Sequence, residues 1–313
     1  MVSEIGFGAW GIGGNQWRGS NDEEGLAALK KALELGVNFI DTALAYNEGH
    51  SERLISQVLK ETGAKAWVAT KVPPKNRLWP AQPGIAIGDV FPYDYVIQMT
   101  ETSLRNLGVE TLDIQQFHVW NPEWIASDEW RRAVEDLKKN GKIRFFGISI
   151  NDHQPDSALE AVKTGLVDTV QVIYNVFDQS PEHNLFPLVQ QMDVGVLARV
   201  PLDEGALTGT VTPETQFDPQ EFRAWYFRGN RKREVYEHVQ ALKKDLSAAG
   251  VTELLADTAL RFCLAHPAVS TVIPGMRRVR NVEMNTKLSE REPLSPEVLA
   301  VLRRHAWQKN YYQ

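Results

Sequence analysis

The chain has 313 residues, of which 43% are hydrophobic and 24% are charged, and its formal net charge is −6. These proportions are typical of a soluble globular protein and exclude a chain that is disordered along most of its length. The mild acidity argues against a nucleic-acid-binding surface, and no run approaches the roughly 18 apolar residues of a membrane span.

Two further features indicate the compartment. Cys263 is the only cysteine, so the chain cannot form an internal disulfide, which fits a reducing compartment. Residues 1–4 contain no basic stretch that leads into an apolar run, so we expect no secretory signal. We therefore predict a cytoplasmic protein with neither a nucleic acid nor a membrane as its partner.

Short apolar runs rich in branched residues alternate along the chain with longer segments of helical period. Most of these runs are apolar at consecutive positions, which is typical of parallel strands buried on both faces. The eight predicted strands are Ile5–Ala9, Val37–Thr42, Trp67–Val72, Leu112–Val119, Ile143–Ser149, Thr169–Tyr174, Gly195–Val200 and Ser270–Ile273.

A predicted helix follows each strand. The first is expected to begin near Ser20, because Ser20 and Glu23 have the spacing of a capping box, and to stop at Gly36. The last is expected to follow Ser295, with Pro296 at its first position. The others are predicted from about Ser51, over Tyr93–Leu107, after Ser127, and near Pro155–Thr164, Glu182–Met192, Asn230–Ala249, Thr252–His266 and Val279–Leu288.

Eight strands that each precede a helix predict a (β/α)₈ TIM barrel, formed as a single domain over residues 1–313. A doubly wound open sheet is the competing fold. It is disfavoured because no Gly-x-Gly-x-x-Gly fingerprint lies between the first strand and the first helix.

Two connections are long, Pro73–Pro92 after the third strand and Pro201–Gly229 after the seventh. Both follow strands, so a barrel places them on its C-terminal face, where barrel enzymes have their active sites. They carry Trp79 and Phe91 in the first loop and Trp225, Tyr226 and Phe227 in the second. These aromatic residues either form an apolar substrate wall or only pack the loops down.

Polar residues stand at or just beyond the ends of three successive predicted strands. Asp41 ends the second strand, with Tyr46 in the loop after it, Lys71 ends the third, and His118 lies at the end of the fourth. A charged residue at the end of an apolar strand is costly unless it is paired or used. Each residue has a structural alternative, namely a loop cap, an ion-pair partner, a loop tyrosine or a hydrogen-bonded core histidine.

Together the four residues predict acid catalysis at an oxygen atom. Lys71 pairs with Asp41 in this interpretation and, lying beside the phenol, lowers the pKa of Tyr46 so that Tyr46 donates a proton. A neutral His118 would orient a carbonyl oxygen, while another group delivers hydride to the carbon. No metal-ligand spacing and no Gly-x-Ser-x-Gly nucleophile elbow accompany them, so we expect no metal.

These residues and the segments around them resemble those of the aldo-keto reductase superfamily. Residues 41–52, Asp-Thr-Ala-Leu-Ala-Tyr-Asn-Glu-Gly-His-Ser-Glu, are similar to its Asp-Thr-Ala…Tyr-Gly-x-Gly-x-Ser-Glu signature, and Lys71 and His118 occupy its catalytic lysine and histidine positions. Residues 147–151, 171–175 and 273–285 resemble its cofactor segments after strands five, six and eight. The similarity runs from about Ile5 to Asn285, which is nearly the whole chain.

The resemblance implies an NADPH-dependent reductase of an aldehyde, ketone or ketosugar. Tyr46 would be the acid, Asp41 and Lys71 would tune it, and His118 would orient the substrate. Ser149 and Gln171 would hold the nicotinamide carboxamide, and Arg277 and Arg278 suit the adenosine 2′-phosphate. The full predicted cofactor set is Gly11, Trp17, Ser149, Asn151, Gln171, Arg199, Pro201, Leu202, Gly205, Leu207, Gly275, Arg277, Arg278, Asn281 and Asn285. The predicted substrate wall is Trp17, Trp79 and Trp120, with Trp10 as a further candidate.

Three positions depart from the family pattern. Arg199 stands where relatives usually have an aromatic residue that stacks on the nicotinamide. We predict either that Arg199 stacks there and disfavours the cationic oxidised ring, or that it pairs with Asp203 or Glu204. Asn47 replaces a glycine after Tyr46, and the chain begins almost inside the first strand, so we expect it to lack the usual N-terminal hairpin.

Two other functions stay open on this sequence. Cofactor-binding β subunits of potassium channels resemble the same pattern and turn over slowly or not at all. An isomerase or dehydratase on the same barrel would consume no cofactor overall. The sequence leaves the identity of the carbonyl substrate and the oligomeric state open.

Overall fold

The structure is a computed structural model that describes residues 1–14, 17, 19 and 21–313. Its eight strands form one parallel sheet in chain order, and each strand pairs with the next. They are β1 (Phe7–Gly8), β2 (Phe39–Asp41), β3 (Trp67–Val72), β4 (Leu112–Phe117), β5 (Ile143–Ser149), β6 (Thr169–Ile173), β7 (Gly195–Arg199) and β8 (Val269–Val272). The predicted strands are confirmed to within three residues at each end.

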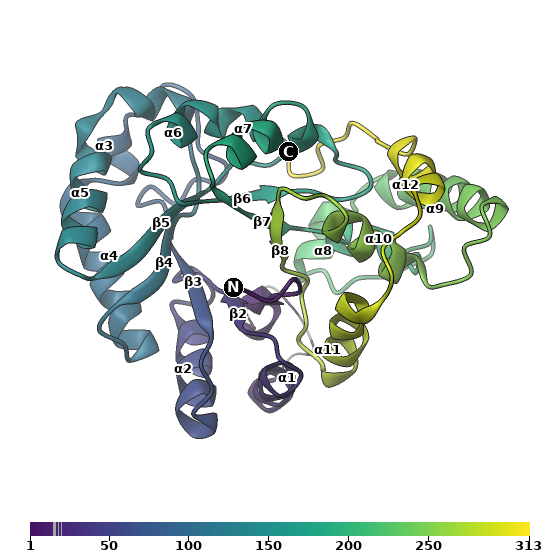
Figure 1. The fold of residues 1–313 in the computed structure, drawn as a ribbon, viewed down its shortest axis with the longest axis horizontal. Coiled ribbons are helices and arrows are strands. Elements are labelled where there is room, and N and C mark those ends of the chain that lie inside the picture. Colours follow the sequence, from purple (N-terminus) through teal and green to yellow (C-terminus); the bar gives the residue numbers. More distant parts are fainter. Residues whose placement is uncertain (15–16, 18, 20) are drawn as a thin grey trace.

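The sheet closes between its first and last strands. Parallel bridges join Ile5 to Val272 and Gly8 to Gly275, and the amide of Gly6 donates to the carbonyl of Val272 at 2.8 Å. Helices lie around the outside of the curled sheet (Figure 1). The predicted (β/α)₈ barrel is therefore confirmed, and the open doubly wound sheet is excluded.

The main helices are α1 (Asp22–Glu34), α2 (His50–Thr62), α4 (Tyr93–Leu107), α5 (Asp128–Lys139), α6 (Leu159–Lys163), α7 (Leu185–Gln191), α9 (Arg231–Ala248), α10 (Leu255–Leu264), α11 (Val279–Thr286) and α12 (Pro296–Arg303). The long loops contain α3 (Ile87–Val90) and α8 (Phe222–Tyr226). Short 3₁₀ turns are η1 (Ala9–Ile12), η2 (Pro122–Ala126), η3 (Pro155–Ala158), η4 (Ser180–Glu182), η5 (Asp203–Thr208) and η6 (Lys287–Glu290).

Local capping explains several helix ends. Ser295 accepts a hydrogen bond from the amide of Val298 at 3.3 Å and Pro296 begins α12, as predicted. At α1 the capping side chain is Asn21, which accepts from the amide of Glu24 at 2.8 Å. The predicted cap Ser20 lies outside the described residues.

Two apolar layers result from the alternation of side chains along the strands. A large layer packs between the sheet and the helices. A small separate cluster of Phe39, Ala69, Ile114, Leu197 and Ile273 comes from alternate positions of five strands and fills the barrel interior. Residues two positions further along β2, β3 and β7 face the same way, one layer nearer the C-terminal ends. They are Asp41, Lys71 and Arg199, so strand periodicity directs all three toward the C-terminal mouth.

Candidate active site

The Asp41–Lys71 pair lies at the centre of the site and is almost completely buried. Lys71 Nζ donates to Asp41 Oδ1 at 2.7 Å, to Asp41 Oδ2 at 2.9 Å and to the carbonyl of Thr42 at 2.7 Å. Gln171 Nε2 also donates to Asp41 Oδ2, at 2.7 Å. Burial lowers the pKa of Lys71, and the adjacent Asp41 carboxylate opposes that shift. The predicted ion pair is thus present, with β6 as an additional contributor.

Tyr46 lies beside this pair, with Lys71 Nζ 5.3 Å from the centre of its ring. Burial raises the pKa of Tyr46 above its ordinary value, and the Asp41 charge raises it further. The predicted lowering of this pKa by Lys71 is therefore wrong. The physical reason is that burial of the phenol and the nearby Asp41 carboxylate disfavour a phenolate by more than the Lys71 ammonium stabilises it. Tyr46 therefore keeps its hydroxyl proton across the neutral pH range.

His118 faces Tyr46 across the pocket, with ring centres 5.9 Å apart, and the Trp79 ring lies nearly perpendicular to it, with ring centres 5.8 Å apart. Burial lowers the pKa of His118 well below its ordinary value, and the charges of Lys71 and Arg199 lower it further. Its Nδ1 atom is buried and has no hydrogen-bond partner within the described part of the chain. Both observations fit the predicted neutral imidazole.

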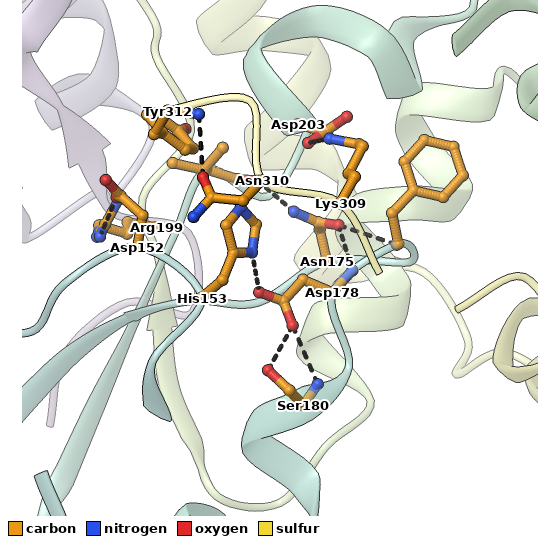
Figure 2. Close-up of polar contacts among 12 residues, drawn as sticks. Asp152, His153, Asn175, Asp178, Ser180, Arg199, Asp203, Lys309, Asn310 and Tyr312 are labelled. Atoms are coloured by element: carbon orange, nitrogen blue, oxygen red, sulfur yellow. Dashed lines mark hydrogen bonds and ion pairs between the residues drawn. The ribbon is translucent and has the colours of Figure 1, made fainter. Parts of the chain in front are cut away.

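Arg199 makes a contact that sequence reasoning missed. Its guanidinium donates to Asp152 Oδ1 at 2.8 Å and to the carbonyl of Ile150 at 3.0 Å (Figure 2). The predicted pairing with Asp203 or Glu204 is wrong, because those carboxylates point to other partners. The pair formed with Asp152 joins the loop after β5 to the end of β7.

A histidine–aspartate pair holds the Asp152 loop in place. His153 has a left-handed backbone, with φ of 56°, and its Nδ1 atom lies 2.6 Å from Asp178 Oδ2. Asp178 also accepts from the amide and the hydroxyl of Ser180 (Figure 2). These contacts fix the direction of the chain at His153, and hence of its neighbour Asp152.

These groups open into one pocket of about 710 Å³ on the C-terminal face. The pocket includes Asp41, Tyr46 and His118, and most of the predicted cofactor residues line it. The predicted lining residues that it contains are Gly11, Trp17, Trp79, Ser149, Asn151, Gln171, Arg199, Pro201, Leu202, Gly205, Gly275, Arg277, Arg278 and Asn281. A second, more open hollow of about 750 Å³, beside η3 and η4, contains none of the strand-end residues.

Lys71 is buried behind the pocket wall, and three residues of the predicted cofactor and substrate sets also lie outside the pocket. Trp120 is fully buried, with its ring centre 5.3 Å from Trp130, so it is core and no substrate wall. Leu207 is fully buried in the apolar layer, and Asn285 is buried on α11. The Trp120 side chain turns toward the helices, because it packs against Trp130 of α5. Asn151 lines the pocket, but both ends of its amide bond the backbone of Ala81.

Some lining residues were not predicted, notably Asp152, Phe222 and Tyr312. Phe222 comes from α8 in the second long loop, where aromatic residues were expected. The residues named there behave otherwise, because Trp225 is 42% exposed while Tyr226 and Phe227 are buried. Phe91 of the first loop is also buried, stacked on Phe117 with ring centres 4.2 Å apart. The candidate Trp10 does reach the pocket and stacks near Tyr46 at 6.3 Å.

Glu204 is a pocket carboxyl group with an unusually high pKa. Burial raises its pKa to about 7, the charge of Asp203 adds to the shift, and the Tyr312 hydroxyl and Arg199 oppose it. Tyr312 Oη donates to Glu204 Oε1 at 2.6 Å.

The described residues contain no group of three or more histidine, cysteine or acidic side chains placed to hold a metal ion. Nor does any helix among them combine the length and apolar character needed to cross a bilayer.

Comparison with known proteins finds matches to one enzyme family along almost the whole chain. The sequence profile of the Aldo/keto reductase family matches residues 4–306. The chain is 31% identical to the NADH-specific methylglyoxal reductase of Escherichia coli over 73% of each chain. It is 27% identical to a probable voltage-gated potassium channel subunit beta of Arabidopsis thaliana, over 95% of this chain and 91% of that one. The structure of aldo-keto reductase AKR11C1 from Bacillus halodurans, in its holo form, superposes with a TM-score of 0.77 at 27% identity, covering 100% of this chain and 96% of that one.

Proposed function

Because the chain belongs to the aldo/keto reductase family of oxidoreductases, we propose that it reduces the carbonyl group of a small molecule with NADPH, using Tyr46 as the proton donor. The observation that carries this proposal is the arrangement of Asp41, Lys71, Tyr46 and His118. They come from three neighbouring strands and the residues just beyond them and meet at the pocket, where Asp41 and Lys71 are buried and Tyr46 and His118 are half-buried.

The residues present fit an extended dinucleotide phosphate. Ser149 and Gln171 lie at the strand ends beside Asp41 and would hold the carboxamide, while Arg277 and Arg278 line the pocket at the start of α11 and would hold the 2′-phosphate. A Cβ atom added at Gly275, which also lines the pocket, would meet no protein atom within 4 Å and would project into space that a ligand can occupy. When bound, NADPH supplies the hydride.

The protein's own groups then manage the oxygen atom of the substrate. Tyr46 is protonated because burial raises its pKa, so its Oη proton is available to a developing alkoxide, which is a stronger base than phenolate. We place the proton of neutral His118 on Nε2, because a buried Nδ1 with no partner costs less as a bare acceptor than as an unmatched donor. Nε2 then donates to the carbonyl oxygen and orients it.

Lys71 and Asp41 limit the cost of this proton transfer. As Tyr46 loses its proton, the Lys71 ammonium 5.3 Å from its ring centre stabilises the phenolate. Asp41 keeps Lys71 charged in a site where burial alone favours the neutral amine. The aromatic walls, among them Trp10, Trp79 and Phe222, exclude water from the reacting oxygen and favour substrates with an apolar body.

The alternative is a cofactor-binding regulatory subunit, which the similarity to a named potassium channel β subunit supports. An isomerase or dehydratase is the third reading. The three are separated by turnover: only the reductase consumes NADPH with a carbonyl substrate, and only the regulatory subunit holds NADPH without turnover and retains a protein partner.

The test measures NADPH oxidation with aldehydes, ketones and ketosugars, and NADH is run in parallel because one relative is named as NADH-specific. Wild type is compared with Tyr46→Phe and with Tyr236→Phe, a control on α9 outside the pocket. We expect turnover in wild type and control and a loss of at least about 100-fold in Tyr46→Phe. Tight NADPH binding with no turnover on any carbonyl would favour the regulatory subunit, and equal rates in Tyr46→Phe would refute its role as acid.

A further inference from the structure

The turn after β7 has an unusual backbone. Val200, Asp203 and Glu204 have φ angles of 54°, 48° and 55°, in the left-handed region that non-glycine residues rarely adopt, and Gly205 has φ of 103°. A β-branched residue such as Val200 is especially unfavourable there. Conformations of this kind persist only where surrounding contacts fix them, and they gather at ligand sites. Val200, Glu204 and Gly205 line the pocket.

The turn is fixed by contacts from Asn175, which follows β6, and from Lys309, which lies far away in the sequence. Asn175 Nδ2 donates to the carbonyl of Val200 at 3.0 Å. Lys309 Nζ donates to Asp203 Oδ1 at 2.7 Å, and the Tyr226 hydroxyl donates to the same carboxylate at 3.0 Å. The Lys309–Asp203 pair is buried, with 5% and 3% of the two side chains exposed. Figure 2 shows the Lys309 side chain directed at Asp203.

The same distant segment reaches the next residue of the turn. Tyr312 Oη donates to Glu204 Oε1 at 2.6 Å, and the Tyr312 ring packs against Phe222, Tyr226 and His153 with ring centres 5.1 to 6.1 Å apart. Tyr312 itself lines the pocket. Residues 309–312 therefore contact two successive acidic side chains of one strained turn.

Segment 305–313 is itself firmly docked. The Trp307 ring stacks on His238 with centres 3.7 Å apart and planes 8° apart. Tyr311 Oη donates to Glu234 at 2.5 Å, and Arg231 donates to the carbonyl of Tyr311 at 2.7 Å. The segment that carries Lys309 is thus docked on α9 by several contacts that lie away from the pocket.

We propose that Lys309 and Tyr312 are positioning residues of the cofactor site, which hold the 200–205 turn in the shape that receives the cofactor phosphates. This inference rests on the proposed function, because it takes NADPH as the ligand. A turn of successive left-handed residues gathers backbone N–H groups into a concave surface that suits anions. Lys309 bonds Asp203 and Tyr312 bonds Glu204, so the two residues hold successive positions of this turn.

The test compares Lys309→Met and Tyr312→Phe with wild type. Tyr311→Phe is the matched control, since it removes a hydrogen bond from the same segment that ends on α9 instead of on the turn. Dissociation constants are measured for NADPH and for 2′-AMP, which carries only the adenosine and its 2′-phosphate. If loss of Lys309 leaves the turn competent about a tenth of the time, the dissociation constant for NADPH rises roughly 10-fold. We expect about 3-fold for Tyr312→Phe, no change for Tyr311→Phe, and no change for 2′-AMP in any variant.

Steady-state kinetics give a second readout, in which the KM for NADPH rises in Lys309→Met while kcat at saturating NADPH is retained. The double variant Asp203→Asn/Lys309→Met removes both charges, so it excludes an unpaired buried Asp203 as the cause, and we expect it to bind NADPH as weakly as Lys309→Met. Recovery of wild-type affinity in the double variant, or NADPH affinities within 2-fold of wild type in both single variants, would overturn the proposal. Parallel weakening of 2′-AMP would overturn it too, because the damage would then extend to the whole pocket. If wild type itself fails to bind NADPH, the proposed function is what fails.

Discussion

Glu204→Gln is expected to change how the stability of the protein depends on pH. Burial raises the pKa of Glu204 from 4.5 to about 7, so the folded protein holds this proton more tightly than the unfolded chain does. The carboxylate therefore destabilises the fold above pH 7, and this cost is relieved as pH falls toward 4.5. Glutamine does not titrate, and its amide oxygen can still accept from Tyr312.

The magnitude follows from the two pKa values. Linkage gives a destabilisation by the carboxylate of about 2 kcal/mol at pH 6 and about 3 kcal/mol at pH 8. Relative to wild type, Glu204→Gln should therefore gain about 1 kcal/mol in unfolding free energy between pH 6 and pH 8.

Urea unfolding followed by tryptophan fluorescence at pH 6 and pH 8 measures this difference. Glu214→Gln is the control, because Glu214 is an exposed glutamate in the same long loop and its substitution should leave the pH dependence unchanged. If wild type and Glu204→Gln show parallel stabilities at the two pH values, Glu204 does not titrate near pH 7 and the reasoning from its burial is refuted.

Three further outcomes are expected. Lys71→Met should abolish turnover and lower the unfolding free energy by about 3–5 kcal/mol, because it leaves Asp41 buried without its cation. Adding Asp41→Asn should restore part of the stability and none of the activity, as measured by urea unfolding and NADPH oxidation. Arg277→Ala should weaken NADPH binding roughly 10-fold and leave NADH binding unchanged, and equal losses for both cofactors in a fluorescence titration would contradict a 2′-phosphate contact. Asp152→Asn should lower the affinity for NADP⁺ relative to NADPH, because the Arg199 charge then lacks its partner beside a cationic ring, and an unchanged affinity ratio in binding measurements would place the nicotinamide away from Arg199.

The pairing of Asp41 with Lys71 could be predicted because both residues sit at strand ends. Parallel neighbours in a barrel end on the same face, and the register aligns Asp41 with Ala69, two residues before Lys71. Side-chain alternation then turns both inward. The same logic predicted His118, because the strands run in chain order around the barrel, whereas Gln171 was predicted only from the family resemblance. It did not give the pKa of Tyr46, which depends on how much surrounding protein removes water from the phenol.

Residues in loops followed no such rule. Trp120 was expected in the pocket and is packed between Trp124 and Trp130, since the chain beyond His118 leaves the strand geometry. Arg199 was expected either to stack on the nicotinamide or to pair with acidic residues near it in sequence. It pairs instead with Asp152, whose loop takes its direction from a left-handed histidine.

By itself, the sequence determined the barrel, the face that carries the site and the four polar residues at its centre. These follow from periodicities of two and 3.6 residues, which act over short stretches of chain. Only the tertiary structure decided what surrounds that centre. Lys309 and Tyr312 meet the turn after β7 across 106 and 108 residues, and such contacts depend on how whole helices dock and on burial, which no local pattern encodes.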